Sequence, residues 1–125
     1  MKLHLSSAAA VLGFGLIAGS GAAAAQTANR GKEVFEKRCT GCHALVTQKV
    51  GPPLRTVFGR AAGSVPSFPY SNSLRQSGIK WDARTLDQWL AGTDSLVPDN
   101  DMAFRVADPK ERTAVIDYLK QLSTP

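Results

Sequence analysis

The sequence is poor in the residues and patterns that several protein classes require. Its 125 residues include only two cysteines, two histidines, two methionines and two tryptophans. The longest apolar run, AAAVLGFGLIA from Ala8 to Ala18, is far shorter than the ~20 residues that span a bilayer. No stretch alternates apolar and polar residues for long enough to predict a sheet. The length fits one domain and excludes a large two-domain enzyme.

The first 25 residues have the pattern of a secretory signal peptide. Lys2 and His4 precede the apolar run, and Ala23–Ala25 supply the small residues that a signal peptidase accepts before Gln26. We therefore expect residues 1–25 to be a signal that is cleaved after Ala25, residues 26–125 to form the domain, and the product to be periplasmic. Retention of the segment as a membrane anchor is the alternative.

The distribution of charge argues against nucleic-acid binding. The segment Gln26–Arg84 carries 10 basic and 3 acidic residues, whereas Thr85–Pro125 carries 4 and 7. The two halves therefore have opposite signs of net charge, which predicts a dipolar molecule more than a uniformly basic surface.

Residues 26–125 predict a small all-α domain. Helical spacing and capping signals place helices over Asn29–Arg38, Ser71–Gln76, the segment from Asp82 to Gly92, and Asp108–Leu122. Only 38 of these 100 residues are apolar, and glycine and proline punctuate long loops between the helices. Loops of this length favour a chain that wraps around a bound group.

The last two of these helices have the clearest boundaries. Asp108 is expected to be the N-cap, Pro109 a first-turn proline, and Glu111 the N3 glutamate of a capping box. The apolar face of this closing helix comprises Val115, Tyr118, Leu119 and Leu122. The helix after Asp82 is expected to end at Gly92 and to bury Leu86, Trp89 and Leu90.

The strongest chemical signal is the CxxCH segment Cys39-Thr40-Gly41-Cys42-His43. A thioredoxin-like dithiol would follow a strand of a βαβ unit, and no such pattern precedes Cys39. A structural zinc site needs four ligands, but residues 26–125 hold two cysteines and one histidine. Covalent haem attachment needs two thiols and an adjacent imidazole for the iron, and it also agrees with export. The segment therefore favours the third interpretation.

The residues available for a second axial ligand are few. His43 and Met102 are the only histidine and the only methionine after residue 26, so two histidines from one chain cannot hold the iron. Methionine often fills irregular apolar gaps, but Met102 lies in a polar stretch, PDNDMAF, 59 residues beyond His43. We expect Met102 to be the ligand; an open position, water, a lysine or the terminal amine are the alternatives.

With these motifs the sequence resembles the class I cytochromes c, which are soluble single-haem electron carriers. Gly31 and Phe35 precede Cys39 by eight and four residues, as in the first helix of the family, and Tyr118-Leu119 is similar to the aromatic–aliphatic pair of its last helix. The resemblance runs over residues 31–122. It implies the family's fold, in which the two terminal helices cross and short helices and long loops surround one covalently bound haem c.

The resemblance also implies roles for residues outside the CxxCH segment. Pro52 matches the proline whose carbonyl accepts the ring N–H of the iron-bound histidine, which would fix the tautomer of His43. Arg60, Tyr70 and Trp81 match positions whose polar groups meet the haem propionates. Haem carboxylates inside a protein need donors, and these three side chains are suitable ones.

The function that the resemblance implies is one-electron transfer without enzymatic activity, with iron held by His43 and Met102. The expected partners are other redox proteins: a membrane cytochrome complex, an oxidase, a reaction centre or a periplasmic dehydrogenase. Contact with membrane-bound complexes would be transient, and the protein would be a monomer. The alternatives are a haem c subunit of a periplasmic dehydrogenase or oxidase, and a gas-binding or peroxidatic haem with an open axial position.

Overall fold

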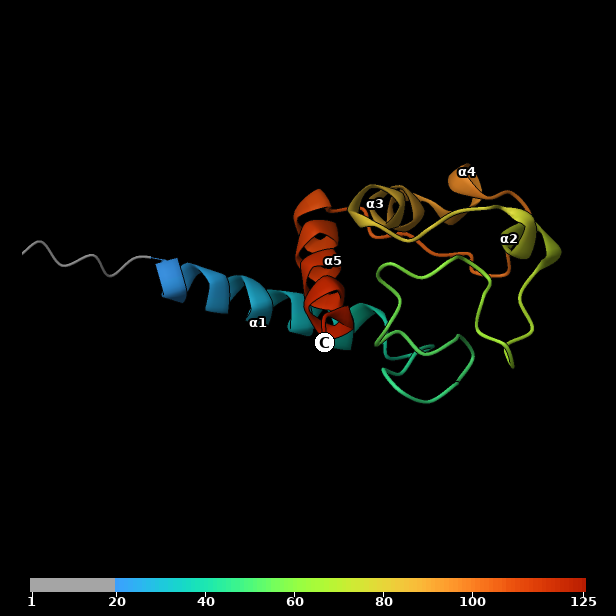
Figure 1. The fold of residues 1–125 in the computed structure, drawn as a ribbon. Helices are drawn as coiled ribbons and strands as arrows, with labels where there is room; N and C mark the ends of the chain where they lie inside the picture. The colour runs from blue at the N-terminus through green and yellow to red at the C-terminus, as the bar shows by residue number, and fades with distance from the viewer. Residues whose placement is uncertain (1–19) are drawn as a thin grey trace, which may run out of the picture.

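The computed structural model describes residues 20–125 and contains five helices over that range (Figure 1). They are α1 (Ser20–Arg38), α2 (Asn72–Gln76), α3 (Ala83–Ala91), α4 (Thr93–Leu96) and α5 (Pro109–Ser123). Within residues 20–125 the only β pairing is an isolated bridge between Ala61 and Lys80. The prediction of an all-α fold is therefore confirmed.

Helix α1 begins nine residues before the predicted start at Asn29. The added segment includes four consecutive alanines, and alanine has the highest intrinsic helix propensity. Residues 21–27 are exposed, so these turns add nothing to the core. The predicted signal peptide lies outside the described residues up to position 19, and its last six residues form the start of α1.

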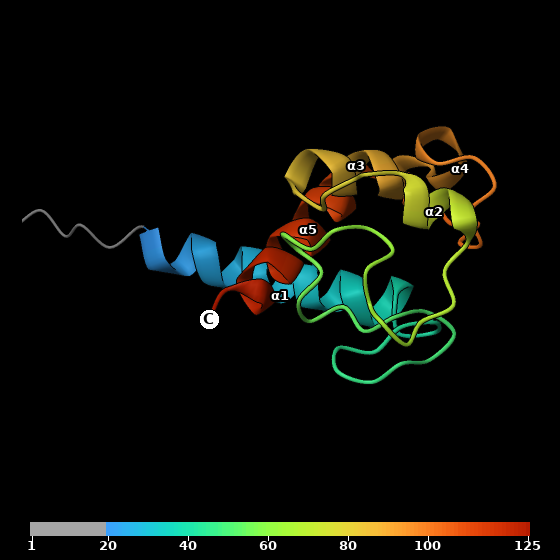
Figure 2. The same cartoon turned by 45° about the vertical axis from the view of Figure 1, so that its right-hand side comes forward.

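Helices α1 and α5 cross closely, and the other helices and the long loop after α1 lie to one side of the crossing (Figures 1 and 2). Gly31 makes the close approach: a Cβ built there would lie 2.3 Å from the carbonyl oxygen of Ala114 and 2.6 Å from the Cβ of Tyr118. One turn further along α1, the rings of Phe35 and Tyr118 pack with centroids 5.7 Å apart. The sequence-predicted helix crossing is therefore present.

Gly31→Ala should destabilise the protein even though alanine is the better helix former. The gain in helix propensity is about 1 kcal/mol, whereas forcing a methyl group against the backbone of α5 costs about 1–3 kcal/mol or more. Thermal unfolding should show a lower Tm. Lys32→Ala, on the exposed face of the same helix, is the control and should change stability by less than about 0.5 kcal/mol. A Gly31→Ala protein as stable as the wild type would contradict the packing argument.

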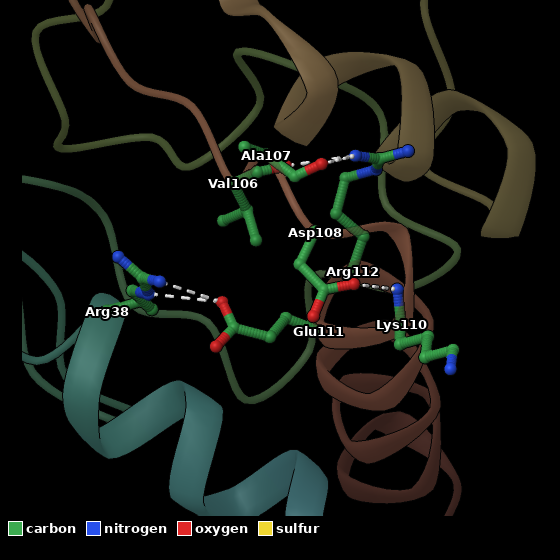
Figure 3. Close-up of polar contacts among 7 residues, drawn as sticks. All are labelled: Arg38, Val106, Ala107, Asp108, Lys110, Glu111 and Arg112. Carbon is green, nitrogen blue, oxygen red and sulfur yellow. Dashed lines mark hydrogen bonds and ion pairs between the residues drawn. The ribbon is translucent and has the colours of Figure 1, made fainter.

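The start of α5 differs from its prediction in one respect. Asp108 does cap the helix, accepting a hydrogen bond from the backbone N–H of Lys110 at 2.8 Å. Glu111 does not complete a capping box; its carboxylate pairs with the guanidinium of Arg38 at 2.9 Å (Figure 3). The capping-box prediction was therefore wrong, because the carboxylate finds a charged partner at the end of α1.

Arg112 ties α5 to the rest of the domain. Its Nε donates to Asp87 on α3 at 2.7 Å, and its Nη1 donates to the carbonyl oxygens of Val106 and Ala107 (Figure 3). The segment before α5 and helix α3 are thereby held against α5 by one side chain.

Helix α3 has the capping box that α5 lacks. The carboxylate of Asp82 accepts from the N–H of Thr85 at 2.8 Å, and the Thr85 hydroxyl accepts from the N–H of Asp82 at 2.9 Å. The hydrogen bond from the Thr85 N–H holds the pKa of Asp82 below its ordinary value. As predicted, the helix ends at Gly92 and buries Leu86, Trp89 and Leu90. The following short helix α4 was not predicted, because four residues offer no periodicity.

Candidate functional site

A cavity of about 420 Å³ lies inside the fold, and its walls are mostly apolar. All eight residues that the sequence singled out for a haem site line it: Cys39, Cys42, His43, Pro52, Arg60, Tyr70, Trp81 and Met102. Several residues of the hydrophobic core also face it: Val57, Leu86, Trp89, Leu90, Val115 and Leu119. The core is therefore arranged around this space instead of filling it.

The CxxCH segment continues directly from α1. The N–H of Cys39 donates to the carbonyl of Phe35, and the N–H of His43 donates to the carbonyl of Cys39, each at 2.8 Å. Cys39, Cys42 and His43 all line the cavity. Both thiols are free, and burial raises the pKa of Cys39 to about 11. A reactive dithiol has a lowered thiol pKa, so this environment does not favour the thioredoxin-like interpretation.

A zinc site finds no support in the described part of the chain. Within residues 20–125, no three or more histidine, cysteine, aspartate or glutamate side chains cluster so that they could hold a metal ion. The donors at the cavity are two thiols, one imidazole and one thioether, a set that suits a haem attached through sulfur.

His43 is held in one orientation. The side chain is 8% exposed, and its Nδ1 lies 2.8 Å from the carbonyl oxygen of Pro52. Because a carbonyl only accepts, Nδ1 carries the proton and the lone pair of Nε2 is left for a metal. Burial lowers the pKa of His43, which the hydrogen bond to Pro52 partly offsets. The imidazole is therefore kept neutral, the form that ligates metals.

The backbone around Gly51 supports the imidazole from one side. A Cβ at Gly51 would lie 2.2 Å from Cε1 of the His43 ring, so only glycine allows the backbone to approach the ring this closely. The N–H of Gly51 donates to the Cys42 carbonyl at 2.8 Å. The ammonium of Lys49 donates to the Thr40 carbonyl. These bonds fasten the loop after His43 back onto the CxxCH segment.

The side chains of Arg60 and Tyr70 offer hydrogen-bond donors that could bind an acidic group. Both terminal nitrogens of the guanidinium donate to the Pro53 carbonyl at 3.2 Å, while its Nε is buried without a partner in the described part of the chain. Burial also lowers the pKa of Arg60. The Tyr70 hydroxyl accepts from the N–H of Val65 at 3.4 Å and keeps its own hydrogen to donate. Trp81 is also buried, and its backbone N–H donates to the Arg60 carbonyl at 2.9 Å.

Met102 is 59 residues from His43 in the sequence but lines the same cavity. It is half-buried and packs against the hydrophobic core, and its loop runs from α4 to α5. The volume of the cavity falls within the range of about 300–1,000 Å³ found for small-molecule sites. Apolar walls, an unsatisfied cationic donor and two thiols together fit a large, flat, acidic group bound through sulfur.

Comparison with known proteins shows the family of the chain. Residues 28–123 match the family model described as Cytochrome c. The chain belongs to the cytochrome c family. It is 37% identical over 98 residues to cytochrome c of Cochliobolus lunatus, covering 75% of this chain and 91% of that protein. It is 39% identical over 114 residues to cytochrome c2 of Rhodomicrobium vannielii, covering 88% and 90%.

A solved structure shows the same fold. Cytochrome cH from Methylobacterium extorquens superposes with a TM-score of 0.71 at 38% identity, covering 75% of this chain and 97% of that one. Like its family, this cytochrome binds covalent haem c with its iron and carries electrons; it is not an enzyme. Its partners are therefore redox proteins. Within residues 20–125, no helix is both long and apolar enough to cross a membrane.

Three features of the cytochrome were not predicted from the sequence. The contact between Gly51 and the His43 ring, the bond from Lys49 to the Thr40 carbonyl, and the bonds of Thr93 to the Met102 loop all depend on how loops fold back. A glycine before proline is a visible signal for the first of these. The lysine and the threonine have no local pattern that would have identified them.

Proposed function

We propose that this cytochrome shuttles single electrons between periplasmic or membrane-bound redox proteins. Its haem is attached at Cys39 and Cys42, and its iron is held by His43 and Met102. The observation that carries this assignment is that the only histidine and the only methionine after residue 26 line one cavity with both cysteines. When bound, the haem supplies reversible one-electron chemistry at its iron.

The side chains around the site favour a high reduction potential. The thioether of Met102 is a soft ligand that favours the reduced metal, and apolar walls disfavour the additional positive charge of the ferric state. Pro52 fixes the tautomer of His43 through the Nδ1–H hydrogen bond. Two protein ligands also exclude oxygen and peroxide from the iron, which supports a carrier over a gas-binding or peroxidatic site.

Arg60, Tyr70 and Trp81 hold the haem carboxylates in this proposal. The Nε of Arg60, which has no partner among residues 20–125, and the free hydrogen of the Tyr70 hydroxyl support it, because a buried carboxylate needs such donors. The lowered pKa of Arg60 reflects burial of its cation, and a carboxylate beside it would compensate for that burial.

Residues 1–25 act as the export signal, so the periplasmic protein begins at Gln26. The support is the order of a basic start, an apolar run and an alanine site. Haem attachment through thiols outside the cytoplasm is consistent with this route.

The optical spectrum and the intact mass of the purified protein test the proposal together. The ferric protein should show the charge-transfer band of sulfur bound to iron, and the mass should equal residues 26–125 plus one haem. A high-spin ferric spectrum would refute Met102 as the ligand, and a mass without haem would refute the attachment. A mass that includes residues 1–25 would refute cleavage after Ala25.

A further inference from the structure

The loop that carries Met102 is held from outside the cavity by Thr93. Thr93 begins α4, is 2% exposed, and is not among the residues that line the cavity. Its hydroxyl donates to the carbonyl oxygen of Met102 at 2.5 Å and accepts from the N–H of Phe104 at 3.3 Å. The N–H of Thr93 also donates to the Phe104 carbonyl at 3.5 Å. One buried residue thus fixes both ends of the Met102–Phe104 segment.

Asn100 holds the backbone N–H of Met102. Its Oδ1 accepts from the N–H of Met102 at 2.7 Å, and its Nδ2 donates to the Val97 carbonyl at 2.9 Å and to a carboxylate oxygen of Asp94 at 2.8 Å. The N–H and the carbonyl of Met102 therefore both have side-chain partners. Met102 lies in neither a helix nor a strand. The side chains of Thr93 and Asn100 therefore supply the hydrogen bonds that regular secondary structure would otherwise give its backbone.

The residue before Asn100 shows why the loop needs such support. Asp99 has a φ of 60°, a left-handed conformation that residues other than glycine adopt at a cost. Its carbonyl accepts from the Ser73 hydroxyl on α2 at 2.8 Å. The loop is therefore held in a single, locally unfavourable path by contacts to α2 and α4.

We propose that Thr93 and Asn100 are positioning residues for Met102, which keep its thioether on the iron against competing ligands. This inference rests on the proposed ligation of the iron by Met102. A methionine side chain has three rotatable bonds and little intrinsic preference for one direction. A fixed backbone raises the effective concentration of its sulfur at the metal. If the loop is released, this effective concentration falls, and a ligand from solution competes more successfully for the iron.

Titration of the ferric holoprotein with imidazole tests the proposal, with loss of the sulfur–iron band as the readout. Thr93→Val keeps the shape of the side chain and removes the hydroxyl, which leaves the Met102 carbonyl without its side-chain donor. We expect imidazole to bind about tenfold more tightly, which corresponds to about 1.4 kcal/mol and is the size expected for one such bond. Thr93→Ser retains the hydroxyl and should stay within about twofold of the wild type.

Thr85→Val is the matched control. Thr85 is also buried, at 8% exposure, and its hydroxyl donates to the Lys80 carbonyl and accepts from the N–H of Asp82, but it does not line the cavity. Its loss should lower Tm without changing the affinity for imidazole. Asn100→Ala is the second test, independent of whether Thr93→Val folds, and should also tighten imidazole binding.

Three outcomes would overturn the inference. These are wild-type imidazole affinity in the folded Thr93→Val protein, wild-type affinity in Asn100→Ala, and an equal increase in Thr85→Val. A failure of the underlying ligand assignment is recognised separately, because the unsubstituted ferric protein would then itself lack the sulfur–iron band.

Discussion

Replacing both Cys39 and Cys42 with alanine should leave the chain mostly unfolded. Without attachment of the haem, the cavity of about 420 Å³ remains inside the domain. At about 24 cal/mol per Å³ of cavity, this costs on the order of 10 kcal/mol. The entire stability of a domain is only about 5–15 kcal/mol, so the empty fold has almost nothing left to oppose chain entropy.

The measurement is far-UV circular dichroism during urea titration of the double variant. We expect low helicity and no cooperative transition. The single variant Cys42→Ala, which keeps one thioether bond and His43, is the control and should fold with haem in place. A double variant that unfolds cooperatively without haem would show that the protein core is sufficient by itself.

The second large effect is expected for Met102→Ala, which should fold but lose its high reduction potential. Removing the soft thioether removes the preference for reduced iron, and axial ligands set haem potentials over a range of about 0.8 V. We expect a fall on the order of 0.1 V or more. The sulfur–iron band should disappear, and the iron should bind imidazole or cyanide readily.

Spectroelectrochemical titration measures this potential, and Val50→Ala is the matched control. Val50 also lines the cavity but is 77% exposed. Val50→Ala should therefore keep the sulfur–iron band, and any change in its reduction potential should be a small fraction of the change in Met102→Ala. If Met102→Ala retained the wild-type band and potential, another group would be the axial ligand.

The parts of the fold that depend on near neighbours were predictable. The N-caps at Asp82 and Asp108 and the end of α3 at Gly92 follow from residues within one helical turn. The first error was the role of Glu111, which depends on Arg38, 73 residues away. The second was the start of α1, which extends into an alanine-rich segment interpreted as part of a signal.

The candidate site divides in the same way. The CxxCH spacing is local covalent chemistry, and the counts of histidine and methionine by themselves favour His43 and Met102 as the iron ligands. The sequence did not predict that these residues line one cavity. The loops between them are interrupted by glycine and proline and have no periodicity from which their path could be inferred. The tertiary structure brings them to one cavity.

By itself, the sequence determined the type of chemistry, the helical class of the fold and the most specific candidates for the site. Only the tertiary structure decided which groups support them: the backbone of Gly51 against the imidazole, the buried Nε of Arg60, and the hydroxyl of Thr93 on the Met102 carbonyl. The physical reason is the separation along the sequence over which each effect acts. Covalent spacing, helical period and capping act within a few residues, whereas burial and hydrogen bonding in loops depend on where distant segments meet.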